Sequence, residues 1–133
     1  MSEENVEVVR QAHEAFNRRN LDVLAGLTDP DWVMDWSRSM SPQRGVYRGR
    51  AGVEAWMAEI TDAFESFEIQ PLEYVKAGDQ IVVPTRVKGR GRGSGVVIDA
   101  EGATVWELER GRVIRLTLYG TRQQALEAAG LRE

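Results

Sequence analysis

The chain has 133 residues, of which 42% are hydrophobic and 29% charged, and its net charge of −4 argues against nucleic acid as a partner. It has no cysteine and one histidine, which excludes disulfides, thiol catalysis and a multi-histidine metal site, so we expect one domain over residues 1–133 with no metal and no cofactor. A run of about 18 apolar residues is absent and the N-terminus is acidic, so we expect no membrane contact, no targeting signal and a cytoplasmic location.

Helical periodicity dominates the first half of the sequence. Ser2 can cap a first helix whose apolar stripe includes His13, and Asn20 can cap a short second helix that carries leucines. A short apolar stretch from Trp32 to Trp36 then predicts a strand. A polar loop from Ser37 to Gly49 leads to a third helix, which is predicted to begin at about Ala51 with apolar residues on one side as far as Phe67.

The second half changes to a period of two, which is typical of strands. The predicted strands are Phe67 to Val75, a strand from Ile81, Val96 to Asp99, Ala103 to Glu109 and Arg112 to Tyr119. Pro71 and Pro84 indicate edge or irregular positions, because proline cannot donate to a sheet ladder. Turns are expected at Glu101-Gly102 and at Arg110-Gly111, and Thr121 can cap a last helix from Arg122 to Ala129.

This order of elements favours an α+β fold, in which a strongly curved antiparallel sheet carries its helices on one face. The other face must then be solvated or paired with a partner. On the last strand that second face carries Arg115, Thr117 and Tyr119, which form an amphipathic surface. Such a surface suits a protein contact, so we expect a homodimer through the outer face of the sheet.

Six segments, in this order and spacing, carry a family resemblance: Ala15–Asp22, Asp29–Asp31, Gly45–Gly49, Gly78-Asp79, Gly111–Val113 and Ala125–Leu131. They resemble the SnoaL-like branch of the nuclear transport factor 2 (NTF2-like) superfamily over nearly the whole chain. The resemblance implies a cone-shaped, cystatin-like α+β barrel, usually a homodimer, with helices on the concave side and a deep apolar pocket. The family includes ketosteroid isomerases, polyketide cyclases and limonene epoxide hydrolases, together with ligand-binding members and members without known activity.

Asp35 is the first candidate catalytic residue, because it lies among the apolar residues of the strand Trp32–Trp36. A carboxylate buried there must be paired, protonated or partly hydrated. By the resemblance, Asp35 falls where ketosteroid isomerases carry the aspartate that moves the proton, which makes it a general base or acid. The alternative is a surface-facing acid, or an acid paired with an arginine such as Arg38 or Arg48.

His13, the only imidazole, is the second candidate. It is either a core histidine satisfied by one hydrogen bond or a partner of Asp35 across the cavity. The isomerases also use a tyrosine and a protonated acid as oxyanion donors, and by the resemblance these positions fall at Ala12 and Thr104. A steroid isomerase is therefore not expected, unless His13 or Thr104 supplies a substitute donor.

Two other activities of the family match the chain only in part. Polyketide cyclases use a histidine together with a late aspartate, but the last strand ends in Tyr119-Gly120-Thr121 without an acid. Limonene epoxide hydrolases use an Asp-Arg-Asp relay, to which Asp35 and Arg86 could contribute, but the second aspartate is not identified.

The expected pocket is aromatic, although such residues are also typical of a core. Its expected lining, apart from the two candidate catalytic residues, is Trp36, Tyr47, Trp56, Arg86, Thr104, Trp106 and Leu116. The run Gly89–Gly95 lacks the Lys-Ser/Thr of a phosphate loop and is interpreted as a solvated strand and turn.

Two functions are compatible with these residues. One is a cofactor-free isomerase or cyclase that acts on an apolar cyclic or polyketide-like substrate, with Asp35 as the base and His13 assisting. The other is a non-catalytic module that binds an apolar small molecule or serves as a dimeric scaffold.

Overall fold

The structure is a computed structural model that describes residues 2–38 and 45–131. Its elements in chain order are α1 (Ser2–Asn17), α2 (Leu21–Leu27), β1 (Thr28–Asp35), β2 (Val46–Arg48), α3 (Gly49–Ala63), β3 (Phe64–Pro71), β4 (Val75–Ala77), β5 (Gln80–Gly91), β6 (Val97–Glu109), β7 (Arg112–Tyr119) and α4 (Arg122–Ala128).

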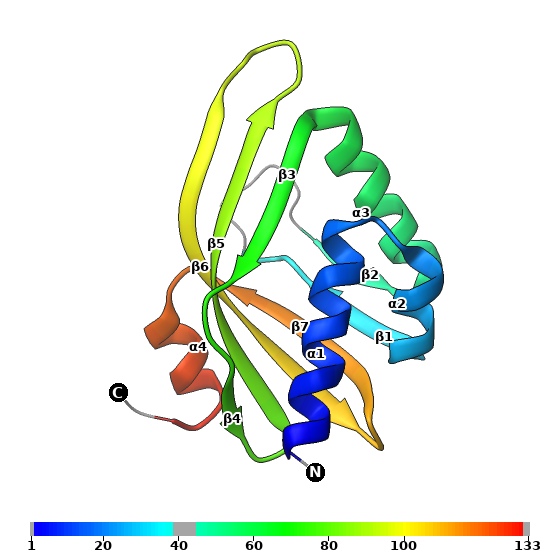
Figure 1. Ribbon diagram of the computed structural model, residues 1–133, viewed down its shortest axis with the longest axis vertical. Coiled ribbons are helices and arrows are strands. Elements are labelled where there is room, and N and C mark those ends of the chain that lie inside the picture. Colours follow the sequence, from blue (N-terminus) through cyan, green and yellow to red (C-terminus); the bar gives the residue numbers. More distant parts are fainter. Residues whose placement is uncertain (1, 39–44, 132–133) are drawn as a thin grey trace.

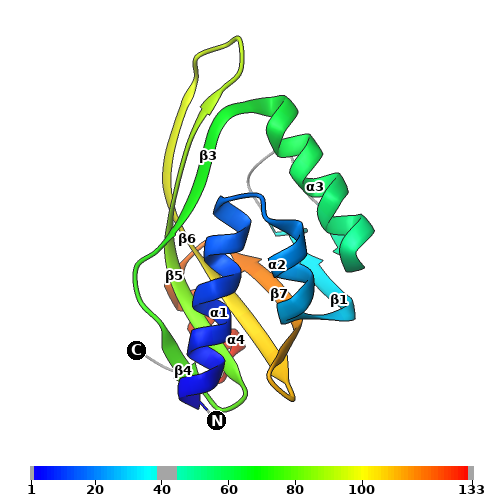
Figure 2. The ribbon, with the colours of Figure 1, turned by 45° about the vertical axis from the view of Figure 1, so that its right-hand side comes forward.

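The seven strands form one curved sheet in the order β2-β1-β7-β6-β5-β3, and β4 pairs with β5 beyond the end of β3. The expected α+β fold is confirmed. One pairing differs from the expected antiparallel sheet, because β1 runs parallel to β7. Helices α1, α2 and α3 lie on the concave side in Figure 1, and the turned view of Figure 2 agrees.

Helix α4 lies on the other side of the sheet, which corrects the expectation that all helices share one face (Figure 1). Its Ala125 and Leu126 pack on Val82, Ala103 and Val105, which project from the outer face of β5 and β6. Because this face of the two strands is apolar, it needs a cover of its own. Among the described residues, α4 also contacts the end of β7 near Tyr119, whereas it makes no comparable set of contacts with β1.

Several predicted boundaries are wrong, among them the strand expected from Phe67 to Val75, which runs from Phe64 to Pro71. Val46–Arg48, inside the expected loop, pairs with β1 as strand β2, while residues 39–44 of that loop lie outside the described residues. The third helix ends at Ala63, so Phe64 and Phe67 belong to β3. The turn expected at Glu101-Gly102 does not form, because β6 stays paired with β5 without interruption from Val97 to Glu107.

Both prolines lie at the positions that their chemistry predicts. Pro71 is the last residue of the edge strand β3. The carbonyl of Pro84 accepts from Leu72 N at 2.9 Å, on the side of β5 where β3 ends and β4 has not yet begun. Since N and O of a strand residue point to the same side, the missing N–H of Pro84 faces this gap and costs no bond to β6.

The two predicted helix caps are confirmed. Asn20 Oδ1 accepts from Val23 N at 3.2 Å at the start of α2. Thr121 Oγ1 accepts from Gln124 N at 3.1 Å, and Gln124 Oε1 in turn accepts from Gly120 N at 3.2 Å, which gives the expected reciprocal pattern at the start of α4.

The free edge of β3 is covered by side chains from the end of α1 and the turn that follows. Asn17 Nδ2 donates to the carbonyl of Ile69 at 2.9 Å, and Ile69 N donates to Asn17 Oδ1 at 3.0 Å. Arg19 Nη2 donates to the carbonyl of Phe67 at 3.3 Å. These groups occupy positions where the backbone of a further strand would otherwise pair.

Candidate functional site

An aromatic cluster lies between the concave face of the sheet and helices α1 and α3. The ring centroids of His13 and Trp106 are 5.1 Å apart, and those of Phe16 and Trp106 are 6.1 Å apart. Phe16 also contacts Trp56 at 5.5 Å, and Trp56 contacts Trp36 at 5.0 Å. The structure thus brings four of the predicted site residues into one connected interior cluster.

Thr104 and Leu116 border this cluster from neighbouring strands. Both side chains are buried, and Leu116 faces Trp106 across the β6–β7 pairing. The indole Nε1 of Trp106 donates to Thr104 Oγ1 at 2.9 Å, and Thr104 Oγ1 in turn donates to the carbonyl of Val83 at 3.4 Å. Trp106 and Thr104 therefore satisfy each other, which gives them a structural role.

Several other polar atoms in this interior have no partner. Among the described residues, buried side-chain atoms without a hydrogen bond include His13 Nε2, Trp36 Nε1, Trp56 Nε1 and Thr85 Oγ1. Leaving such a group unsatisfied costs about 1–3 kcal/mol, and native proteins keep few of them. Four such atoms lie on the concave side of one sheet. They are therefore the strongest indication that a bound molecule would make its hydrogen bonds there.

His13 is buried and neutral. Burial lowers its pKa to about 4, although a hydrogen bond to the backbone of Ile69 works in the opposite direction. Nε2 has no hydrogen-bond partner among the described residues. In the tautomer that carries the ring hydrogen on Nδ1, this free nitrogen in the aromatic cluster is a hydrogen-bond acceptor and a potential proton acceptor.

Asp35 lies on the opposite face of the sheet. Its strand neighbours Met34 and Trp36 enter the core, so the alternation of β1 directs the Asp35 side chain outward. Its Oδ2 accepts from Arg115 Nη2 at 2.7 Å, and its Oδ1 accepts from Ser37 N at 3.0 Å and from Ser37 Oγ at 2.6 Å. This is the arginine-paired alternative, with Arg115 in the place suggested for Arg38 or Arg48.

The surroundings of Asp35 favour its ionised form. Burial works to raise its pKa, but the hydrogen bonds from Ser37 and the charge of Arg115 outweigh that effect and lower the pKa below its usual value. Its side chain is 13% exposed, so this ion pair is only partly open to solvent. Because Asp35 and His13 lie on different sides of the sheet, the structure does not bring the two candidate catalytic residues together.

Arg86 and Tyr47 also lie away from the unpartnered atoms. Arg86 projects from the outer face of β5, where its Nε donates to Asp99 Oδ1 at 2.7 Å. Tyr47 projects from β2 against α3, and its hydroxyl donates to Glu59 Oε2 at 3.0 Å. Burial raises the pKa of Tyr47, and the hydrogen bond and charge of Glu59 raise it further, so the phenol stays protonated.

The arginine- and lysine-rich stretch of β5 is balanced by acids on adjacent strands. Lys88 faces Glu68 on β3 and Asp99 on β6, and Arg90 Nε lies 3.5 Å from Glu65 Oε1. These pairs leave no cluster of unbalanced cations along the outer face of β5, which supports the interpretation as a solvated strand. The turn beyond it is pinned by Arg92, whose guanidinium donates to the carbonyls of Thr61 and Phe64.

Thr85 and Arg115 were not predicted as site residues. Thr85 belongs to the inward-facing set of β5, and the period of two alone would have placed it there. The partnership of Arg115 with Asp35 depends on the parallel β1–β7 register, which no local pattern encodes.

None of the helices in residues 2–38 and 45–131 is long and apolar enough to cross a membrane. The same part of the chain contains no group of three or more histidine, aspartate or glutamate side chains arranged to hold a metal ion.

Comparison with known proteins gives a family and a fold. Residues 9–116 match the sequence model of a family described as SnoaL-like domain. An NTF2-like protein of unknown function from Burkholderia pseudomallei K96243 is 24% identical, with a TM-score of 0.79 over 93% of this chain and 95% of that chain. TerC, co-crystallised with polyporic acid, is 18% identical, with a TM-score of 0.78 over 96% and 98% of the two chains.

A third solved structure is described as a putative SnoaL-like polyketide cyclase from Jannaschia sp. CCS1. It is 21% identical, with a TM-score of 0.75 over 89% of this chain and 85% of that chain. At these identities the likeness establishes a shared fold. None of the curated proteins matches the chain.

Proposed function

Because the chain belongs to the SnoaL-like domain family, we propose that it binds a small, cyclic, largely apolar molecule inside the curved sheet. The observation that carries this proposal is the unpartnered Nε2 of His13, buried in an aromatic cluster that also holds the free indole N–H groups of Trp36 and Trp56. Ligand sites are typically apolar, with a few polar groups that fix the orientation of the ligand.

The polar atoms define the chemistry that the ligand must have. The two indole N–H groups require acceptor oxygens, and the lone pair on His13 Nε2 requires a hydroxyl donor. A flat ring system with both hydroxyl and carbonyl groups meets both requirements. Polyporic acid, the compound co-crystallised with TerC, is an aryl-substituted dihydroxyquinone of this kind, and the polyketide cyclase description of another structural neighbour points to similar molecules.

Proton transfer on such a molecule is the second candidate function. The specific feature that favours it is again His13, since a neutral imidazole with a free lone pair in apolar surroundings can act as a general base. In this candidate His13 takes the role expected of Asp35, which is held in its ion pair with Arg115 on the outer face.

Titration of the nitrogen-15-labelled protein with polyporic acid and a panel of hydroxylated naphthoquinones tests both candidates. Binding should shift the indole signals of Trp36 and Trp56 saturably. His13→Leu should weaken binding about 2- to 12-fold, which corresponds to one hydrogen bond, whereas Asp35→Asn serves as the matched control and should leave affinity unchanged. Unmoved Trp36 and Trp56 signals across the panel, or equal affinity in His13→Leu, would contradict the proposal.

Turnover separates the two candidates. Mass spectrometry and NMR of each bound compound after incubation would detect hydrogen exchange with solvent or isomerisation. Exchange that the His13→Leu variant abolishes supports the enzyme, whereas tight binding without exchange supports the binding module.

We also propose that two chains associate through the outer face of β1 and β7. Support comes from Val33 and Thr117, which flank the Asp35–Arg115 ion pair there, while α4 packs on β5, β6 and, near Tyr119, the end of β7. Sedimentation equilibrium should give twice the chain mass of 14.9 kDa. Val33→Arg should give a monomer, whereas Val96→Arg at the exposed hairpin tip should not, and a monomeric native protein would contradict the proposal.

A further inference from the structure

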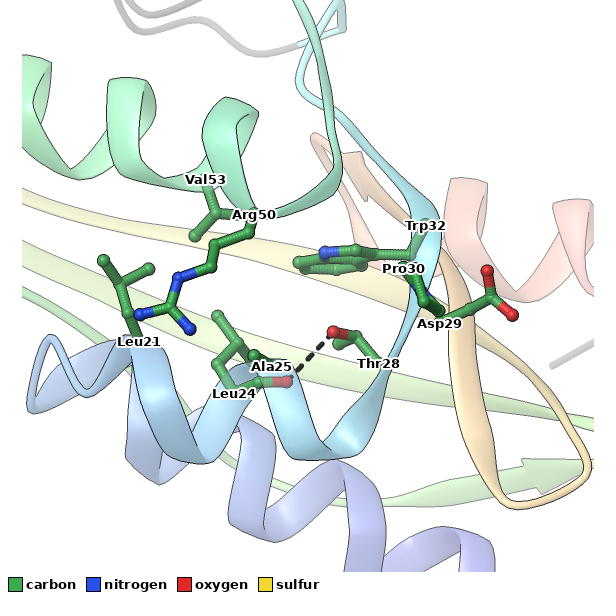
Figure 3. A pocket seen from close by; sticks show the side chains of 9 residues that line it. All are labelled: Leu21, Leu24, Ala25, Thr28, Asp29, Pro30, Trp32, Arg50 and Val53. Atoms are coloured by element: carbon green, nitrogen blue, oxygen red, sulfur yellow. Dashed lines mark hydrogen bonds between the residues drawn. The ribbon is translucent and has the colours of Figure 1, made fainter.

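A pocket lies outside the aromatic cluster, between α2, the start of β1 and the first turns of α3 (Figure 3). Its volume is about 220 Å³, and it is lined by Leu21, Leu24, Ala25, Thr28, Asp29, Pro30, Trp32, Arg50 and Val53. Most of this lining is apolar. The Trp32 ring forms one wall, and its centroid is 6.2 Å from that of Phe16, so the tryptophan separates this pocket from the interior cluster.

Trp32 supplies a free hydrogen-bond donor. Only 2% of the residue is exposed, and within residues 2–38 and 45–131 its indole N–H has no acceptor. Figure 3 shows the ring extending from β1 into the space beside Val53 and Arg50. This N–H keeps some contact with solvent, and an acceptor oxygen of an occupant can replace water as its partner.

The charges around the pocket favour an uncharged occupant. Arg50 at the mouth donates from Nη2 to Asp22 Oδ1 at 2.8 Å, and its Nε lies 3.5 Å from Glu54 Oε1. Its positive charge is thereby balanced, so an anion gains little there. Asp29 also lines the pocket, but Figure 3 shows its carboxylate, which accepts from Asp31 N at 2.9 Å, directed away from the space beside Trp32, so a cation finds no free carboxylate there.

The hydroxyl hydrogen of Thr28 is not available to an occupant of the pocket. Its Oγ1 already donates to the carbonyl of Leu24 at 3.0 Å, as the dashed line in Figure 3 marks. Trp32 therefore offers an unused side-chain donor in the wall of the pocket.

The size of the pocket limits the ligand to a single ring. An apolar cavity of about 150 Å³ holds benzene, so the larger volume here leaves room for a ring with one short substituent. We propose that this pocket is a second ligand site, which takes an uncharged monocyclic molecule whose acceptor oxygen bonds to the indole N–H of Trp32. The site does not depend on the interior one, because the two lie on different sides of the Trp32 ring.

Acetophenone and ethylbenzene form a matched pair of probes, because they differ mainly by the carbonyl oxygen. In titrations of the full nitrogen-15-labelled chain, acetophenone should shift the Trp32 indole signal saturably, while the Trp106 signal stays in place. Ethylbenzene should bind about 2- to 12-fold more weakly, which corresponds to one lost hydrogen bond. Trp32→Phe assigns the signal and should abolish this preference.

A filled pocket provides the second arm of the test. Ala25→Phe places a ring among the lining side chains and should lower affinity for acetophenone at least tenfold. Val23→Phe, on the same helix but at a position that is 45% exposed, is the control and should bind like the native protein. Trp32→Phe keeps the proposal testable if Ala25→Phe does not fold. The proposal would be overturned by the absence of a saturable Trp32 shift or by undiminished binding of acetophenone to Ala25→Phe. Shifts confined to the Trp36 and Trp56 signals would also overturn it.

Discussion

Acidification from pH 8 to pH 5 should destabilise the protein through His13. Burial lowers the pKa of this imidazole from 6.5 to about 4 in the folded chain, whereas in the unfolded chain it titrates near its ordinary value. Between these two values the unfolded chain takes up a proton that the folded chain does not. The unfolded state therefore binds more protons, and the free energy of unfolding falls as the pH decreases through this window.

The size of the effect follows from the two pKa values. Proton linkage at this one site lowers the free energy of unfolding by about 2 kcal/mol between pH 8 and pH 5. The decrease reaches about 3 kcal/mol well below pH 4. The value at pH 5 depends little on the folded pKa, because a group that titrates near 4 is still mostly neutral there. Against a typical unfolding free energy of about 5–15 kcal/mol, this is a large change.

Urea unfolding followed by tryptophan fluorescence at pH 8, 7, 6 and 5 measures the effect. The His13→Leu variant has no imidazole, so its loss of stability over the same range should be smaller by about 2 kcal/mol. Because the chain has a single histidine, its ring proton signals are unambiguous, and they should not move between pH 8 and pH 5 in the folded protein. A folded imidazole that titrates near 6.5, or equal pH dependence in both proteins, would refute the reasoning.

Two further predictions concern the outer ion pair and the backbone beside α3. Asp35→Asn should lower the free energy of unfolding by about 1 kcal/mol at pH 7. Since the pKa of Asp35 is lowered in the folded state, this contribution is complete above its unfolded pKa and is lost as the pH falls through its folded pKa, so a difference between the urea curves that does not shrink on acidification would count against it. Gly49→Ala should destabilise by about 1–2 kcal/mol, because Gly49 has a φ of +62° and a Cβ there would lie 2.9 Å from the carbonyl oxygen of Pro30. Gly26→Ala, in α2 with open space around it, should instead stabilise by about 0.5–1 kcal/mol, and thermal unfolding of the two variants would show opposite signs.

The sequence predicted those features that a few neighbouring residues determine by their own chemistry. The caps at Asn20 and Thr121 and the position of Pro84 are examples, because each depends on neighbours in sequence or on a missing donor. The turn predicted at Glu101-Gly102 failed for the opposite reason. The two residues are compatible with a turn, but they lie opposite Arg86 and Thr85 in a continuous ladder, which local sequence cannot reveal.

In the candidate site, too, features set by nearby residues were predicted, whereas features set by distant strand pairing were not. The helical stripe placed His13 toward the core, where the structure finds it, because the side of a helix follows from spacing alone. Asp35 looked buried because its sequence neighbours are apolar, yet its own side of β1 is set by the strand alternation. Its partner Arg115 lies 80 residues away, so the ion pair became visible only through the parallel pairing of β1 with β7.

The side-chain cover on the edge of β3 has a consequence for how this protein can polymerise. Growth of the sheet by addition of a strand from another molecule would require Asn17 and Arg19 to release the backbone of Ile69 and Phe67. Release of Asn17 amounts to fraying of the last turn of α1, so the barrier to fibril growth at this edge is tied to the local stability of one helical turn. Conditions that loosen the end of α1 would therefore open this route to polymerisation before the core of the domain unfolds.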